Sequence, residues 1–190
     1  MRRRPNYSGN TSLQLYVLGA VFLLPLTIGV VLVSNNANRS EYAYRISHDL
    51  GSMYAQGVDF SQKANQDIAL SVASGIGHDI QGGLGVVILS KIKMVHPADC
   101  PESAQKCANR GYPVVVERFV LGNHSLRTSS FGTPESLDPA SGKVRDWAND
   151  LTARAKNFAS ALKPGEVMYA AECYLTAAES HSGVYSRSMF

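Results

Sequence analysis

The feature that most constrains this chain is an apolar run near its N-terminus, from Leu13 to Val33. The run carries no charged residue, and its only polar side chains are those of Gln14, Tyr16 and Thr27. As a helix it would be about 31 Å long at roughly 1.5 Å per residue, enough to cross the hydrocarbon core of a bilayer. The sequence therefore predicts a transmembrane helix over residues 13–33.

The residues after the run bear on whether this helix is a retained anchor or a cleaved export signal. A cleavable signal has a shorter apolar region, of roughly 7 to 15 residues, followed by small residues around the cut. Here Ala37 is preceded by Asn35 at a position that should be small. The pattern favours a retained anchor, and cleavage near Ala37 is the alternative.

The charges around the run predict its orientation. Arg2, Arg3 and Arg4 carry all the charge before it, and every Asp and Glu lies after residue 40. Because Lys and Arg are enriched on the cytoplasmic side, residues 1–12 are expected to be a cytoplasmic leader and the rest extracytoplasmic. The chain has 18 Lys and Arg and 15 Asp and Glu, so its net charge of +3 equals the charge of these three arginines, and the part after residue 12 is neutral. A nucleic-acid partner, which needs a basic face, is not expected.

Residues 34–82 are expected to be helical. The apolar run continues without proline into an amphipathic pattern, which predicts one long helix from about residue 11 to 56. Asp59, with Gln62 three residues later, has the pattern of a capping box and predicts that a second helix begins there.

Residues 83–190 have the pattern of an α+β domain. Alternating or apolar segments predict about four antiparallel strands, at residues 84–94, 112–122, 166–178 and 183–190. In the first of these the alternation places Lys91 and Lys93 on a solvent-exposed face.

Two segments between the strands carry further expectations. Val144, Trp147 and Leu151 begin a series of apolar residues at spacings of three and four, which predicts one further helix over 143–162 packed on the sheet. The polar loop at 123–142 is long enough to be functional.

The chain has three cysteines, at positions 100, 107 and 173. Cys100 and Cys107 bracket a short polar loop, and outside the cytoplasm such a pair indicates a disulfide; two free thiols are the alternative. Cys173 falls on the apolar side of a strand and is expected to be buried.

No catalytic motif is evident. The sequence lacks a G-x-S-x-G turn, an H-E-x-x-H pair and a phosphate-binding loop, and no two histidines have metal-ligand spacing. We therefore predict no catalytic, cofactor-binding or metal-binding residue, no cofactor, and no enzymatic activity.

The N-terminus resembles a type IV pilin-like leader, in which a basic peptide and a glycine precede an apolar helix: here Gly9 is followed by NTSLQLYVLGAVFLLPL. With GLGVVILSKIKM, GEVMYAAECYLTA and GVYSRSMF, the layout is similar to the TadE-like pseudopilins of bacterial Tad (tight adherence, Flp-type) pili. That family has Glu and then an aromatic after the four residues that follow the glycine, where this chain has Gln14 and Leu15.

The resemblance implies a pilin-like fold and a membrane-anchored minor pilin or pilus assembly component. It also implies prepilin-type processing between Gly9 and Asn10, with Gln14 at the polar position of the pilin helix. The implied location is the bacterial inner membrane or a pilus. The implied partners are the lipid bilayer, other pilins or assembly proteins, and a prepilin peptidase.

Two other functions stay open from the sequence. One is a single-span extracytoplasmic sensor or ligand-binding module. The other is a membrane-tethered enzyme, for which the loop at 123–142 would be the candidate site.

Overall fold

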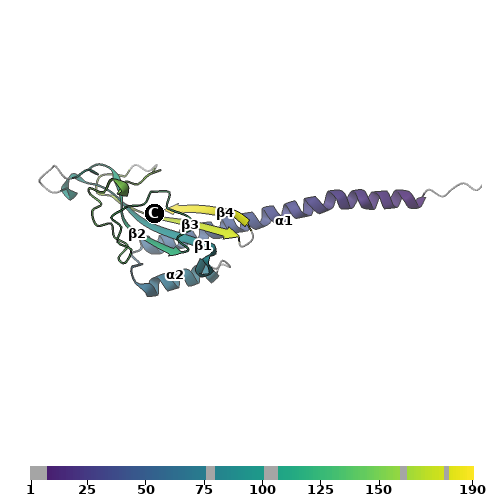
Figure 1. Cartoon of the computed structure of the whole chain (residues 1–190), viewed down its shortest axis with the longest axis horizontal. Helices are drawn as coiled ribbons and strands as arrows, with labels where there is room; N and C mark the ends of the chain where they lie inside the picture. Colours follow the sequence, from purple (N-terminus) through teal and green to yellow (C-terminus); the bar gives the residue numbers. More distant parts are fainter. Residues whose placement is uncertain (1–7, 76–79, 101–106, 159–161, 178–179) are drawn as a thin grey trace, which may run out of the picture. The chain divides into compact units, whose positions relative to one another are not determined.

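The computed structural model describes residues 8–75, 80–100, 107–158, 162–177 and 180–190. It divides into two compact units, residues 1–39 and 40–190. The helices and strands, which Figure 1 shows, are α1 (Ser8–Ala55), α2 (Lys63–Gly75), β1 (Gly85–Met94), β2 (Pro113–Gly122), β3 (Val167–Ala177) and β4 (Ser180–Met189). Three short helical turns complete the list: η1 (Ile80–Leu84), η2 (Pro97–Asp99) and η3 (Leu151–Ala153).

The first unit contains the N-terminal part of α1. The large apolar side chains from Leu15 to Val33 are exposed, each by more than half of its surface. Of the described helices, α1 is long and apolar enough to cross a membrane. The predicted long helix is therefore confirmed, and its apolar part is a candidate membrane span.

The second unit is built on one antiparallel sheet with the strand order β2-β1-β3-β4. The central strands β1 and β3 pair over their length, with Val87 opposite Cys173 and Leu89 opposite Ala171. The C-terminal segment forms the edge strand β4, in which Ser186 lies opposite Cys173. The predicted α+β fold with a four-stranded antiparallel sheet is confirmed.

One face of the sheet is covered by helices. Residues 40–55 of α1 present small and apolar side chains at helical spacing, and α2 adds two buried alanines. The core cluster on this face includes Ala43, Ile46, Leu50, Tyr54, Phe60, Ala69, Ala73, Val87, Leu89, Phe119, Ala171, Cys173 and Leu175. Gly51 permits the close approach of α1 to β3, because a Cβ atom there would lie only 2.9 Å from that of Ala171.

The opposite face is covered by residues from the long connection between β2 and β3. Its core cluster includes Ile92, Val95, Val114, Val115, Phe131, Val144, Ala153 and Ala170. β1 is therefore buried on both faces, and the prediction that one side of it is solvated is wrong. The reason is its central position: Lys91 shares its face with Val87 and Leu89, which pack against the helices.

The prediction of an α-helix over 143–162 is wrong as well. The described part of this segment consists of turns, isolated bridges and the single 3-10 turn η3, and residues 159–161 lie outside the described residues. The backbone binds β2 instead: Val144 N donates to Val116 O at 2.9 Å, and Ala155 N donates to Pro113 O at 2.8 Å. Trp147 and Phe158 pack partly buried against the second core cluster, so the apolar spacing reflects burial on β2 and β1.

Two smaller expectations are resolved by the structure. Cys100 and Cys107 form a disulfide, and Cys173 is free and buried, both as predicted. The second helix begins at Lys63, four residues later than the capping-box pattern suggested. Asp59 caps a turn before it, where its Oδ1 accepts hydrogen bonds from the backbone N and the Oγ of Ser61.

Candidate functional site

The residues singled out for membrane function lie along α1. Gly9 and Asn10 are in its first turn, and Gln14 follows about one turn later with its side chain exposed. All three lie on the same helix, in the first unit.

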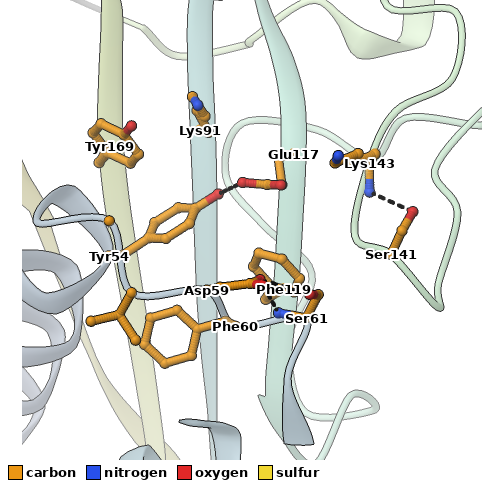
Figure 2. Close-up of a pocket in the computed structure, with 12 residues that line it drawn as sticks. Tyr54, Asp59, Phe60, Ser61, Lys91, Glu117, Phe119, Ser141, Lys143 and Tyr169 are labelled. Carbon is orange, nitrogen blue, oxygen red and sulfur yellow. Dashed lines mark hydrogen bonds between the residues drawn. The ribbon is translucent and has the colours of Figure 1, made fainter.

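The second unit contains a concave site that the sequence did not indicate. We call it the aromatic–lysine pocket; its cavity volume is about 360 Å³. Figure 2 shows residues from several elements converging on it. Its lining includes the side chains of Tyr54, Asp59, Phe60, Ser61, Lys91, Glu117, Phe119, Ser141, Lys143 and Tyr169.

Aromatic rings form the apolar part of the pocket. Tyr54 comes from the last turn of α1, and Phe60 from the turn that follows it. The Tyr54 ring meets those of Phe60, Phe119 and Tyr169 edge-on, with centroids 5.0 to 5.9 Å apart. Edge-to-face packing of this kind is favourable beyond the area that it buries, so the rings are held in place by one another.

A row of charged residues crosses the sheet beside these rings. In the backbone pairing of the sheet, Lys91 of β1 lies opposite Glu117 of β2. On the other side of β2, the backbone of Lys143 forms an isolated β-bridge with Glu117. The Lys91 Nζ atom lies 5.5 Å from the centre of the Tyr169 ring. The backbone pairing thus places Glu117 between Lys91 and Lys143.

The hydroxyl group of Tyr54 joins the aromatic and charged parts of the pocket. It donates a hydrogen bond of 2.6 Å to Oε2 of Glu117, drawn as a dashed line in Figure 2. Burial and this hydrogen bond raise the pKa of Tyr54 well above its usual value. Tyr54 therefore stays neutral at physiological pH and acts as a fixed donor to Glu117.

The second carboxylate of the pocket, Asp59, is ionised. Hydrogen bonds from Ser61 and Gln62, with a smaller contribution from the nearby charge of Lys143, lower its pKa. Because its Oδ1 and Oδ2 atoms both accept hydrogen bonds, Asp59 is already occupied by groups of its own turn.

A second polar cluster lies on the opposite face, beneath the loop that was predicted to be functional. Glu172 of β3 accepts hydrogen bonds from the hydroxyl of Ser129, the backbone N of Ser130 and the hydroxyl of Tyr185. The loop at 123–142 is thereby tied to the sheet through a buried carboxylate.

Arg118 of β2 supplies the counter-charge for this cluster. Its Nε atom donates to Ser90 Oγ at 3.0 Å, and its Nη1 atom donates to the carbonyl of Gly132. Burial lowers the pKa of Arg118 to about 10, while the charge of Glu172 opposes the shift. Arg118 therefore remains protonated at neutral pH and places a positive charge near Glu172.

The structure brings together no metal-binding set in the part of the chain that it describes: no three His, Cys, Asp or Glu residues converge there. The convergence of the lysines and carboxylates of the aromatic–lysine pocket could not be predicted from the sequence, because these residues are far apart in the chain. A usable signal was present in each strand, since Lys91 and Glu117 are charged residues within mostly apolar segments.

The chain was compared with protein-family models, with curated proteins and with solved structures, and none of these comparisons finds a match. The likeness to TadE-like pseudopilins therefore rests on residues of this sequence, chiefly Gly9, the apolar helix after it and the strand segments.

Proposed function

We propose that this chain is a membrane-anchored TadE-like minor pilin or pilus assembly component of the bacterial inner membrane. One observation carries the proposal: α1 is unbroken from Ser8 to Ala55, and its first part is apolar and exposed. The last part of the same helix packs on an antiparallel sheet through Ala43, Ile46 and Leu50. A helix divided in this way suits a protein that is anchored by one half and carries a folded domain on the other.

In this proposal the N-terminus is cytoplasmic and the second unit is extracytoplasmic. The three N-terminal arginines support that orientation, and the disulfide between Cys100 and Cys107 supports an oxidising compartment for the second unit. The protein works through lateral packing of its membrane helix and contacts of its exported domain with other pilins or assembly proteins. It requires no cofactor for this role.

Gln14 favours a minor subunit over the main filament subunit. A buried carboxylate in lipid is costly and is strongly drawn to a neighbouring positive charge, whereas an amide can only form hydrogen bonds. Gln14 is therefore less costly to insert but attracts a neighbour's amine more weakly than Glu would at this position.

The mass of the intact protein isolated from membranes tests the proposal. Processing by a prepilin peptidase removes residues 1–9, with or without methylation of Asn10. The variant Gly9→Leu places a bulky side chain at the cut and is expected to retain the leader, while Gly19→Leu, inside the apolar run, is the matched control and is processed normally. An unprocessed wild-type chain would contradict the cut at Gly9, and cleavage near Ala37 would contradict the anchor itself.

A second candidate function is a single-span extracytoplasmic sensor or ligand-binding module. The observation that favours it is the aromatic–lysine pocket, a concave site with charged and aromatic walls in the second unit. Pockets of about 300 Å³ or more are typical of small-molecule sites.

A further inference from the structure

We propose that the aromatic–lysine pocket binds a small organic monocarboxylate, held by Lys91 and Lys143 with its apolar part against the rings of Phe119 and Tyr169. This inference concerns the second unit only, and it holds whether or not the chain is processed at Gly9. Figure 2 shows the lysines and the rings around the same cavity.

The lysines have unused binding capacity. Among the residues that the structure describes, no carboxylate lies within 4 Å of the Nζ atom of Lys91 or Lys143. This holds although the backbone of Glu117 pairs with the backbones of both lysines. Lys93, two residues after Lys91 in β1, differs from them, because its Nζ atom forms a 2.6 Å ion pair with Asp99. An ammonium group without a carboxylate partner at the edge of a cavity can donate hydrogen bonds to an anion, and the contact of Lys91 with the Tyr169 ring does not use these donors.

Asp59 and Glu117, the carboxylates of the pocket, already accept hydrogen bonds from other groups and are therefore weak competitors of a ligand for the two lysines. Asp59 is bound by Ser61 and Gln62, and one oxygen of Glu117 is bound by the Tyr54 hydroxyl. Their negative charges nevertheless limit the charge of the ligand. Two lysines and two carboxylates sum to zero, so each negative charge on a ligand adds directly to the net charge of the site, and a monoanion is better tolerated than a dianion.

The walls define the rest of the ligand. Phe60 is fully buried and offers a ligand no surface, whereas Phe119 is 7% exposed and Tyr169 is partly exposed. An apolar group packed against these two rings would be removed from water, which favours binding. The hydroxyl group of Ser141 lines the same cavity; it accepts a hydrogen bond from the backbone N of Lys143 and can donate its hydrogen to a carboxylate oxygen. A cavity of about 360 Å³ accepts a ring with one carboxylate, and this points to aromatic or cyclic monocarboxylates.

Titration of the full chain in a non-ionic detergent with benzoate, followed by ligand-detected NMR, tests the inference. Benzamide has the same ring without the charge, and acetate has the charge without the ring. We expect saturable benzoate binding, with benzamide and acetate each at least fivefold weaker. Partition into the detergent micelle does not saturate and is the same for every protein variant.

Three variants locate the binding. Lys91→Gln and Lys143→Gln each remove one ammonium group and are expected to weaken benzoate about tenfold, the usual effect of losing a charged hydrogen bond. Lys63→Gln removes an exposed lysine of α2 outside the pocket and leaves binding unchanged. Because Lys143 is exposed, its variant is expected to unfold at the wild-type temperature, which separates lost binding from lost structure.

Several results would overturn the inference. They are the absence of saturable benzoate binding to the wild type, equal affinity for benzoate and benzamide, and equal losses from Lys63→Gln and Lys143→Gln. None of these results bears on the mass of the processed chain, so failure here is distinct from failure of the pilin proposal.

Discussion

Glu172 lies in a sheet interior, only 2% exposed, and its two oxygens accept three hydrogen bonds. A buried carboxylate is tolerated when it is hydrogen-bonded and has a positive charge nearby. Arg118, on the same face of the sheet, supplies that charge, and its own burial would be costly without Glu172. The attachment of the loop at 123–142 therefore depends on a single buried carboxyl side chain.

Replacing this carboxylate by an amide is expected to lower stability sharply. Glu172→Gln replaces one acceptor oxygen by an amide that faces the donors of Ser129, Ser130 and Tyr185, and it leaves Arg118 as an uncompensated buried charge, so we expect a loss of about 2–4 kcal/mol. Tyr185→Phe removes only one of the three hydrogen bonds and should cost about 1 kcal/mol. Denaturant unfolding of both variants in detergent measures the difference. Equal losses would mean that the charge pair contributes nothing.

Lys91 illustrates what could not be predicted for the candidate site. Its alternation with apolar neighbours correctly indicates a strand, but the burial of a strand face depends on what packs against it. That information lies in Tyr54 and Phe60, more than thirty residues earlier in the chain. The pairing partners Cys100 and Cys107 were predictable because a short loop joins them, whereas the pocket is assembled from distant segments.

At the scale of elements, the four strands and both helices were predictable from local patterns, and the segment 143–162 was not. Its apolar residues have helical spacing, yet Asp146, Asn149 and Asp150 bind nearby backbone or side-chain groups, which favours turns over a helix. β2 is an edge strand, and its free backbone groups offer this segment partners that a helix would forgo. Pairing with the edge of β2 replaced helix formation, and the spacing of the apolar residues alone could not predict this pairing.

Asp150 is the residue that holds this irregular segment together. Its carboxylate accepts hydrogen bonds from the backbone N and the hydroxyl of Ser136 and from the backbone N of Thr152. Burial acts in the opposite direction, but these hydrogen bonds outweigh it and lower the pKa of Asp150 to about 2. Since the pKa of an unfolded Asp is 3.8, the ionised form stabilises the folded state above about pH 4.

A pH series on Asp150→Asn tests that link. At pH 7 the variant is expected to be less stable than the wild type by about 1 kcal/mol, in line with the loss of a capping carboxylate. The folded-state pKa is lowered, so this advantage is lost as the pH falls from about 4 toward 2, and the two proteins converge. Asp67→Asn on α2, remote from Ser136 and Thr152, is the control and should show no such convergence. A difference that stays constant down to pH 2 would contradict the role of the ionised carboxylate.

At the scale of the whole molecule, the chain combines two units with opposite solvent preferences. In residues 8–39 the apolar side chains from Leu15 to Val33 are exposed, whereas in residues 40–190 two core clusters bury the apolar side chains on both faces of a sheet. A continuous exposed apolar surface of this length is unfavourable in water and favourable in a bilayer. The exposure of the first unit is therefore an argument for a lipid partner.

A charge within the apolar run tests the membrane span directly. Leu18→Arg is expected to reduce membrane integration strongly, because an arginine inside a span costs up to about 3 kcal/mol on insertion. Asn36→Arg adds the same side chain after the run and serves as the matched control, with integration close to wild type. The measurement is the fraction of full-length protein that stays in membranes after an alkaline carbonate wash. If Leu18→Arg were retained as fully as Asn36→Arg, residues 13–33 would not lie in the bilayer, and the pilin proposal would lose its anchor.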